Sequence, residues 1–377
     1  MRVLYLTNNP NLGSTARILH NWLELGRDEG VNGMAVVPRE GDLAEWMRVS
    51  GFPHQIDSMP WPDRKRPLRS AWHASRLAWW AGRQGVDLIH CNEHDVYPFG
   101  LVLRRLLRRP LVCHVRFRVS RPFCEWVFGS PARVPDALLW TSNQQKADCE
   151  EAVAGLVSED RQQVVYLGLD LNQFGTLADG REATRASWAV HPNEIVIGTA
   201  SALKPIKRLE EFIDMVAQLA HEDERVVGVI AGDAPLGEEA YREELLARMR
   251  SKNLGRRFQW LGNLEPIEPF DHAIDIFVST SEYETFGNSV CEAMACRRPV
   301  AAYRGGSVQE VVGETGYIVE TGDLAQLTEA VRELVQNPIL RAAFGERARA
   351  RVVEQFNPVA SFARLRRIYA ELVDSKQ

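Results

Sequence analysis

The sequence of 377 residues lacks the patterns that mark several large protein classes. No stretch reaches the roughly 18 apolar residues that a helix needs to span a bilayer. A net charge of −5, from 45 Lys and Arg against 50 Asp and Glu, gives no support for a nucleic-acid partner. The N-terminus, MRVLYLTNNPN, has one basic residue and a four-residue apolar run, which indicates a buried strand rather than a secretory signal.

Several motifs of nucleotide binding and catalysis are also missing. Neither half of the chain has G-x-G-x-x-G after its first strand, which argues against a dehydrogenase. There is no G-x-x-x-x-G-K-[ST] phosphate loop, no G-x-S-x-G elbow and no C-x-x-C pair. The six scattered cysteines are expected to be buried, reduced thiols of a cytoplasmic protein: Cys91, Cys113, Cys124, Cys149, Cys291 and Cys296.

Short apolar runs alternate with helical spacing through two halves of the chain, which predicts α/β domains with parallel sheets covered by helices on both faces. We expect an N-terminal domain at 1–170 and a C-terminal domain at 171–355, with a helix at 356–377 folding back over the first. The polar stretch 169–193 is interpreted as the connection. The predicted strands are 2–7, 32–37, 87–92, 110–115, 137–142, 163–168, 194–200, 225–233, 258–262, 275–280, 299–303 and 316–319.

The stretch SEYETFGNSVCEAMACRRPV (281–300) carries two glutamates, Glu284 and Glu292, on either side of a turn after a predicted strand. Gly287 lets the backbone approach a ligand, and a helix predicted from residue 288 would offer its N-terminal amides to an anion. Two carboxylates beside such a site suit a diphosphate that carries hydroxyl-rich groups. The alternative is a capping box, in which Glu292 reaches back to Ser289.

Other turns follow strands of the same half. Lys204 and Lys207 flank Pro205 at a strand–helix junction, where they would neutralise a diphosphate, or else lie solvated at a helix start. Gly232 and Gly262 with Asn263 stand in glycine-bearing turns, which are ordinary loops if nothing else meets there.

The segments ALKPIK, AGDAP, FQWLG, SEYETFGNSVCEAMACRRPV, GGSVQEVV and TGYIV, in this order and spacing, resemble the second half of the GT-B glycosyltransferases of family 4. The resemblance covers about 195–335 and extends more faintly over VLYLTNNPNLGSTA, DLIHCNEHD, PLVCHVR and VVYLGLDLNQF. It implies the GT-B fold, with two doubly wound Rossmann-like domains facing across a cleft. It also implies a nucleotide-diphosphate sugar as co-substrate, retention at the anomeric carbon and no metal or other cofactor.

The resemblance also implies roles for single residues. Glu292 would bind the nucleotide ribose and Glu284 the donor sugar, and His114 would lie by that sugar, unless it is a satisfied core histidine. Asn92 stands where a second histidine is common. The implied catalytic residues are Glu284, Lys207 and His114, and the implied donor-binding residues are Gly13, Lys204, Lys207, Gly232, Gly262, Asn263, Glu284, Phe286, Gly287, Asn288, Ser289 and Glu292.

The expected reaction is hexose transfer to an acceptor hydroxyl in glycan or polysaccharide synthesis, with a UDP-sugar favoured over GDP-mannose. The rivals are a sugar-nucleotide epimerase or phosphorylase on the same fold, and a silent nucleotide-sugar-binding or scaffold protein. The acceptor is a carbohydrate or a lipid-linked sugar. DRKRPLR (63–69), RRLLRR (104–109) and Trp72, Trp79 and Trp80 suggest a peripheral contact with the inner leaflet of a membrane, against the alternative of core tryptophans and solvated arginines.

Overall fold

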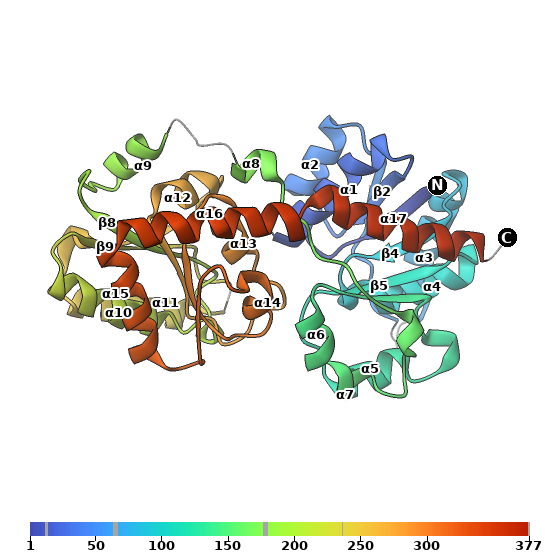
Figure 1. Cartoon of the computed structure of the whole chain (residues 1–377). Helices are drawn as coiled ribbons and strands as arrows, with labels where there is room; N and C mark the ends of the chain where they lie inside the picture. Colours follow the sequence, from blue (N-terminus) through green and yellow to red (C-terminus); the bar gives the residue numbers. More distant parts are fainter. Residues whose placement is uncertain (12–13, 63–66, 176–179, 236, 376–377) are drawn as a thin grey trace. The chain divides into compact units, whose positions relative to one another are not determined.

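The computed structural model divides into two compact units, which are drawn in Figure 1. Unit 1 comprises Met1–Gly168 and Pro358–Gln377, and unit 2 comprises Leu169–Asn357. The structure describes every residue except 12–13, 63–66, 176–179, 236 and 376–377.

Unit 1 is built on a parallel sheet of seven strands in the order β3-β2-β1-β4-β5-β6-β7. The sequence predicted six of them and missed β3, a three-residue strand of sequence HQI that has no apolar run. The strands are β1 (Arg2–Leu6), β2 (Asn32–Val37), β3 (His54–Ile56), β4 (Leu88–Cys91), β5 (Leu111–Val115), β6 (Ala137–Trp140) and β7 (Gln162–Val164).

Helices of unit 1 form two groups. α1 packs against β2 and against α17, the C-terminal helix, whereas α3 packs along α4, and α4 lies on β4 and β5. The helices are α1 (Ser14–Asp28), α2 (Asp42–Val49), α3 (Pro67–Arg83), α4 (Tyr97–Leu107), α5 (Arg121–Phe128), α6 (Asn143–Asp148), α7 (Glu150–Val153) and α17 (Pro358–Asp374), with short 3-10 turns at His94–Val96, Pro131–Arg133 and Glu159–Arg161.

Unit 2 repeats the same strand order in a parallel sheet of six strands, β10-β9-β8-β11-β12-β13. Every residue of β8, β9, β11 and β12 is buried, which is why these strands read as continuous apolar runs in the sequence. The strands are β8 (Ile195–Ala200), β9 (Val226–Ala231), β10 (Phe258–Gly262), β11 (Ile276–Ser279), β12 (Val300–Tyr303) and β13 (Tyr317–Val319).

The helices of unit 2 enclose a core of their own. α10 and α15 contribute much of it, with Phe212, Ile213, Leu327 and Val331 fully buried. The helices are α8 (Leu171–Gly175), α9 (Arg181–Ser187), α10 (Leu209–Glu222), α11 (Glu239–Ser251), α12 (Glu268–Ala273), α13 (Asn288–Ala295), α14 (Val308–Val312), α15 (Leu324–Gln336) and α16 (Pro338–Gln355), with 3-10 turns at Pro205–Lys207 and Gly255–Arg257.

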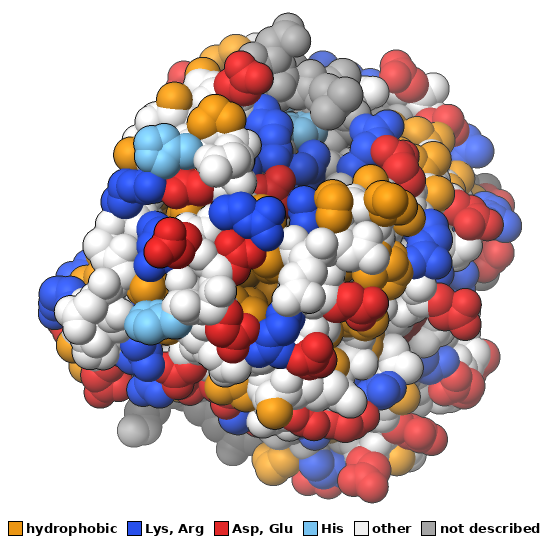
Figure 2. All heavy atoms as spheres, turned by 60° about the vertical axis from the view of Figure 1, so that its left-hand side comes forward, with side chains coloured by type: hydrophobic (Ala, Val, Ile, Leu, Met, Phe, Trp, Pro, Cys, Tyr) orange, Lys and Arg blue, Asp and Glu red, His pale blue; other side chains and the backbone are white. Residues whose placement is uncertain are grey.

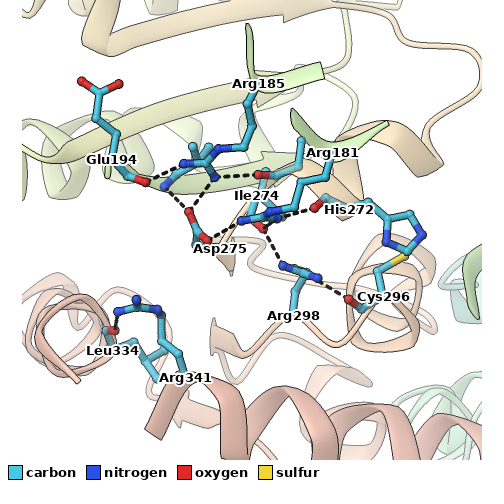
Figure 3. A network of polar contacts seen from close by, with 12 residues as sticks. Arg181, Arg185, Glu194, His272, Ile274, Asp275, Cys296, Arg298, Leu334 and Arg341 are labelled. Carbon is cyan, nitrogen blue, oxygen red and sulfur yellow. Dashed lines mark hydrogen bonds and ion pairs between the residues drawn. The ribbon is translucent and has the colours of Figure 1, made fainter. Parts of the chain in front are cut away.

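The polar stretch 169–193, interpreted from sequence as a connection, is an integral part of unit 2 in its described portion. Arg181 and Arg185 of α9 hold the two carboxylate oxygens of Asp275 at 2.6 and 2.9 Å, as Figure 3 shows. Burial by itself would raise the pKa of Asp275, but the two guanidinium groups bring it below its ordinary value. Two arginines of this polar stretch therefore tie it to the end of the loop before β11.

Both sheets reverse their winding direction at one point, between β1 and β4 in unit 1 and between β8 and β11 in unit 2. In open sheets of this kind, ligands bind outside the carboxyl ends of the strands at the switch point. Each unit therefore has one favoured edge for a site. Within the part of the chain that the structure describes, none of the helices has the length and apolar content needed to cross a membrane.

Candidate functional site

The turn between β11 and α13 lies at the carboxyl edge of the unit 2 sheet. Gly287 precedes the first helical residue, Asn288, and adopts a left-handed conformation with φ 94°, which favours glycine. No side chain caps the helix, and Ser289 is its second residue rather than its cap. The capping-box alternative for Glu292 is therefore wrong, and the first amides of α13 have no partner within the helix.

Lys207 and Glu284 meet at this edge, although 77 positions separate them in the chain. The Lys207 Nζ lies 2.5 Å from Glu284 Oε1, and each side chain is 17% exposed. The hydroxyl of Ser281 donates to the same carboxylate oxygen at 2.8 Å. The two residues therefore form a largely buried ion pair between the loop after β8 and the loop after β11.

Backbone contacts hold the two loops in register. Thr280 Oγ1 donates to the carbonyl oxygen of Lys207 at 2.8 Å, and the Glu282 amide donates to the carbonyl oxygen of Ile206 at 2.9 Å. The loop after β12 closes the other side, where the Ser307 amide donates to the carbonyl oxygen of Glu284 at 2.8 Å. Three loops from adjacent strands thus fix the position of Glu284.

Gly305 lets the β12 loop approach so closely. A Cβ atom at Gly305 would lie 2.2 Å from the carbonyl oxygen of Ser281, so no larger residue fits without moving backbone. Ser307 precedes α14, yet its hydroxyl donates to the carbonyl oxygen of Thr285 rather than capping that helix. Ser307 and Glu310 have the S-x-x-E spacing of a capping box, but the serine hydroxyl serves loop packing instead.

The remaining loop residues predicted for the donor lie at the same edge of unit 2. Gly232 has φ +123°, and its amide donates to the carbonyl oxygen of Gly262 at 2.8 Å. Lys204 and Asn263 are exposed. Lys204, Gly232 and Asn263 follow the ends of β8, β9 and β10, and Gly262 is the last residue of β10, so all four lie on the side of Lys207 and Glu284.

Two other predicted residues are buried. The ring of Phe286 packs edge-on against Phe356, with centroids 5.3 Å apart, so its side chain belongs to the core of unit 2. Glu292, the fifth residue of α13, is 8% exposed. At the edge of the sheet, the backbone after Phe286 is therefore available to a ligand, and the ring of Phe286 is not.

In unit 1, His114 lies inside β5 and is fully buried. Its ring stacks against His90 and Trp22, with centroids 5.6 and 5.5 Å away, and neither ring nitrogen hydrogen-bonds to a described atom. Burial, with Arg116 and His90 nearby, lowers the pKa of His114 well below its ordinary value. The histidine is therefore a neutral member of the core in this unit. Gly13 lies outside the described residues.

Sequence reasoning missed a polar cluster at the switch point of unit 1. Arg116 directly follows β5 and donates from Nε and Nη2 to the backbone and side-chain oxygens of Asn92, at 2.9 and 2.8 Å. Glu93 accepts from Thr7 Oγ1 at 3.0 Å and from the Asn8 amide at 3.2 Å. Burial raises the pKa of Glu93 to about 7. The sequence signal was the polar residues directly after two apolar strands: Asn92 and Glu93 follow β4, and Arg116 follows β5.

The unit 1 cluster and the unit 2 ion pair contain no evident metal site. Among the residues that the structure describes, no group of three or more His, Cys, Asp or Glu side chains is placed to hold a metal ion. The charged groups at the edge of unit 2 are instead suited to an anionic ligand, because a lysine and helix amides meet there.

Comparison with protein families gives two matches that together span most of the chain. The model of the Glycosyl transferases group 1 matches residues 180–351, and that of the Glycosyltransferase Family 4 matches residues 31–173. The first covers the loops of unit 2 described above, and the second covers β2 to β7 of unit 1.

Individual relatives agree with the family matches. The chain is 30% identical over 311 residues to the D-inositol 3-phosphate glycosyltransferase of Corynebacterium jeikeium, covering 76% of this chain and 72% of that protein. It is 25% identical to the lipopolysaccharide core biosynthesis mannosyltransferase LpcC of Rhizobium leguminosarum bv. viciae, over 81% of each chain.

The fold is shared with a solved structure over nearly its whole length. HepE of Anabaena, crystallised in complex with UDP and glucose, superposes with a TM-score of 0.86 at 23% identity, covering 99% of this chain and 100% of that one. With two parallel doubly wound units and these matches, the chain belongs to the group 1 glycosyltransferases of family 4, on the GT-B fold.

Proposed function

We propose that this glycosyltransferase moves a hexose from a UDP-sugar to an acceptor hydroxyl in glycan or polysaccharide synthesis, with retention at the anomeric carbon. The observation that carries the proposal is the Lys207–Glu284 pair, 2.5 Å apart beside the N-terminus of α13. The lysine and the first amides of α13, which have no partner within the helix, suit the diphosphate of such a donor. The carboxylate suits its hydroxyl-rich sugar.

In this proposal the donor binds along the carboxyl edge of the unit 2 sheet. Lys204 and Lys207 take the diphosphate, and the amides of Gly287 and Asn288 take the distal phosphate and the sugar. Glu292 accepts hydrogen bonds from the ribose hydroxyls. The turns at Gly232, Gly262 and Asn263, with Ser289 and the backbone at Phe286, complete the donor side, while Gly13 and His114 act from the N-terminal unit.

The ion pair itself supplies a step in donor binding. Two phosphates offer Lys207 a partner of higher charge than one carboxylate, so Lys207 turns to the donor and frees Glu284. The freed carboxylate then accepts hydrogen bonds from sugar hydroxyls. Ser281 keeps Glu284 in position during this exchange, because its 2.8 Å hydrogen bond does not involve the lysine.

The barrier to transfer lies in the departure of the diphosphate and the growth of oxocarbenium charge on the sugar. Lys204, Lys207 and the α13 amides stabilise the leaving group as its charge develops. Glu284 is a binding group rather than a nucleophile, and the leaving phosphate accepts the proton of the acceptor hydroxyl on the same face. Trapping a covalent glycosyl-enzyme would contradict this front-face mechanism.

These cations take the place of a metal ion, so transfer is proposed to need none. Turnover measured after dialysis against a chelator should equal turnover in added magnesium or manganese. A loss of activity on chelation, restored by one of these ions, would overturn the metal-independent mechanism.

The donor base is supported by HepE, whose crystal structure contains UDP. LpcC is named as a mannosyltransferase, which makes GDP-mannose the competing donor. The deciding experiment is thermal unfolding of the purified protein with UDP, GDP and their sugars. We expect UDP to stabilise by about 2.7 kcal/mol at about one hundred times its Kd, and GDP to do so only weakly. Stabilisation by GDP alone would reject the UDP-sugar.

The acceptor is a hydroxyl of a growing glycan, carried by a carbohydrate or a lipid-linked sugar. All six cysteines are free and buried, which fits work in the reducing cytoplasm. Product analysis with labelled donor would identify the linkage, and product in which the anomeric configuration is inverted would contradict the retaining reaction.

A further inference from the structure

The helix α3 of unit 1 directs two tryptophans away from the protein. Its residues Ala74, Leu77 and Ala81 are fully buried against the core, whereas Trp72 and Trp79 are 62% and 65% exposed. The alternative of core tryptophans is therefore wrong for this pair, and it holds only for Trp80, which packs partly buried against the core. Two large exposed indoles on one helix indicate a contact surface.

These tryptophans form one stripe along the helix. Trp79 lies seven residues after Trp72, and Leu68, 82% exposed, lies four residues before Trp72. Residues at this spacing share one side of an α-helix. The stripe runs from the first turn of α3 almost to its end.

A second stripe of three arginines, Arg69, Arg76 and Arg83, runs beside the first with the same seven-residue repeat. The Arg76 guanidinium lies 5.6 Å from the centroid of the Trp72 ring, and that of Arg83 lies 5.0 Å from the Trp79 ring. Arg76 is also bound to Asp57, at 2.5 Å, whereas Arg69 and Arg83 form no ion pair with any residue that the structure describes. We call the six residues of these stripes the α3 face.

The two helices α3 and α4 add positive charge and contain no acid, and the carboxylate of Asp57 is taken up by Arg76 and His73. Neither 67–83 nor 97–109 contains an aspartate or a glutamate. The end of α4, which packs along α3, exposes Arg105 and Leu106. Figure 2 shows another face of the molecule, where acidic and basic side chains are interspersed. The sequences of α3 and α4 therefore carry charge of one sign only.

We propose that the α3 face docks this enzyme on the surface of an anionic lipid bilayer. Indole and leucine side chains enter the boundary between headgroups and acyl chains, while arginines beside them meet anionic headgroups. A second copy of the chain is a poor occupant, because it would bring arginine stripes of like charge together. A docked transferase reaches acceptors anchored in lipid; that choice of acceptor rests on the proposed function, and the docking does not.

The test is flotation of the full-length protein with two kinds of vesicles, phosphatidylcholine alone and phosphatidylcholine with phosphatidylglycerol. We expect flotation with the anionic vesicles only, weakened by high salt. Trp72→Ser/Trp79→Ser should lower the partition coefficient by about tenfold or more. Arg69→Gln/Arg83→Gln should lower it by about fivefold per arginine.

Matched controls separate the α3 face from general charge. Arg250→Gln/Arg347→Gln removes the same charge from exposed positions of unit 2, and Ile339→Ser removes an apolar side chain that is 82% exposed. Both should float like the unchanged protein. Each variant should keep its stabilisation by UDP, which reports folding and donor binding independently of docking.

Three results would overturn the proposal. They are absence of flotation with anionic vesicles, unchanged flotation of the α3-face variants, and equal losses in the control variants. A shift from dimer to monomer in Trp72→Ser/Trp79→Ser, with flotation unchanged, would assign the face to self-association instead. If UDP stabilised neither the unchanged protein nor the variants, the proposed donor would be contradicted, and the docking result would still hold.

Discussion

Lys207 and Glu284 neutralise each other's charge in a site that is largely closed to water. The pair is 83% buried on both sides, so neither charge is fully solvated if its partner is lost. Glu284 also has a neighbour, Glu282, whose side chain is 59% exposed on the same loop. This neighbour offers a matched comparison between a carboxylate in the site and one beside it.

We expect Glu284→Gln to lower kcat by about one hundredfold. A glutamine has the same shape but lacks the negative charge that stabilises the positive charge growing on the donor sugar. The Kd of UDP should not rise, since Glu284 is assigned to the sugar and its neutralisation leaves Lys207 free for the diphosphate. Glu282→Gln should leave both values unchanged. Steady-state kinetics and UDP titration provide the measurements, and intact turnover in Glu284→Gln would show that the pair is structural.

Glu93 gives a pH-dependent prediction. Its pKa rises from 4.5 to about 7 on folding, mainly through burial, so the folded state binds the proton more tightly than the unfolded one. Stability from this group is therefore fully present below about pH 4.5 and is lost as pH rises to about 7. The loss is at most about 3 kcal/mol.

Denaturant unfolding across this range should show a smaller fall in the free energy of unfolding for Glu93→Gln than for the unchanged protein. Glu282→Gln, on the surface of unit 2, should retain the full fall. An identical pH dependence in Glu93→Gln and the unchanged protein would mean that the carboxyl is not titrating in this window.

At the scale of an element, the turns after β9 and β10 show how two glycines with positive φ differ. Gly232 has φ +123°, and an added Cβ would lie 1.9 Å from the carbonyl oxygen of Ser201. Gly262 has φ +71° and open space around the same position. Conformational strain acts at both sites, but a backbone clash acts only at the first.

We expect Gly232→Ala to destabilise unit 2 by about 3 kcal/mol or more, through displacement of the loop after β8. Gly262→Ala should cost about 1 kcal/mol, the strain of a left-handed residue alone. Urea unfolding of the two variants measures the difference. Equal costs would show that the loop carrying Ser201 yields freely, and so does not fix the position of the lysines that follow it.

At the scale of the whole molecule, the last helix of the chain belongs to the unit in which the chain begins. Phe362, Leu365 and Tyr369 of α17 are almost fully buried in unit 1, and the Tyr369 hydroxyl contacts His90. Unit 1 therefore needs two segments that are about 190 residues apart in the sequence, between Gly168 and Pro358.

Truncation after Asn357 should unfold unit 1 and spare unit 2. Each of the three buried side chains contributes about 2 kcal/mol, so their loss takes most of the stability that a single domain has. Calorimetry should show one transition disappearing and the other persisting. Limited proteolysis would check the assignment, because resistant fragments should map to Leu169–Asn357; a truncated chain with both transitions intact would contradict it.

Much of the architecture could be read from local pattern. Buried parallel strands are continuous apolar runs, so most strands were predicted within a few residues, and β3 was missed because HQI has no such run. The stretch 281–300 carried the family resemblance, since close packing of its loop restricts which residues fit. The short S-x-x-E pattern misled at both places, because Gly287 and not Ser289 precedes α13, and because the Ser307 hydroxyl bonds to the carbonyl oxygen of Thr285 instead of capping α14.

The sequence by itself determined two α/β halves, the family and the residues of one strand edge, because periodicity and turn chemistry act between near neighbours. Only the tertiary structure decided that Lys207 pairs with Glu284, that His114 is fully buried, that Arg181 and Arg185 hold Asp275, and that Trp72 and Trp79 face outward. Each of these depends on which distant segments cover a side chain. A helical spacing shows that two residues share a face, but not whether another element lies against it.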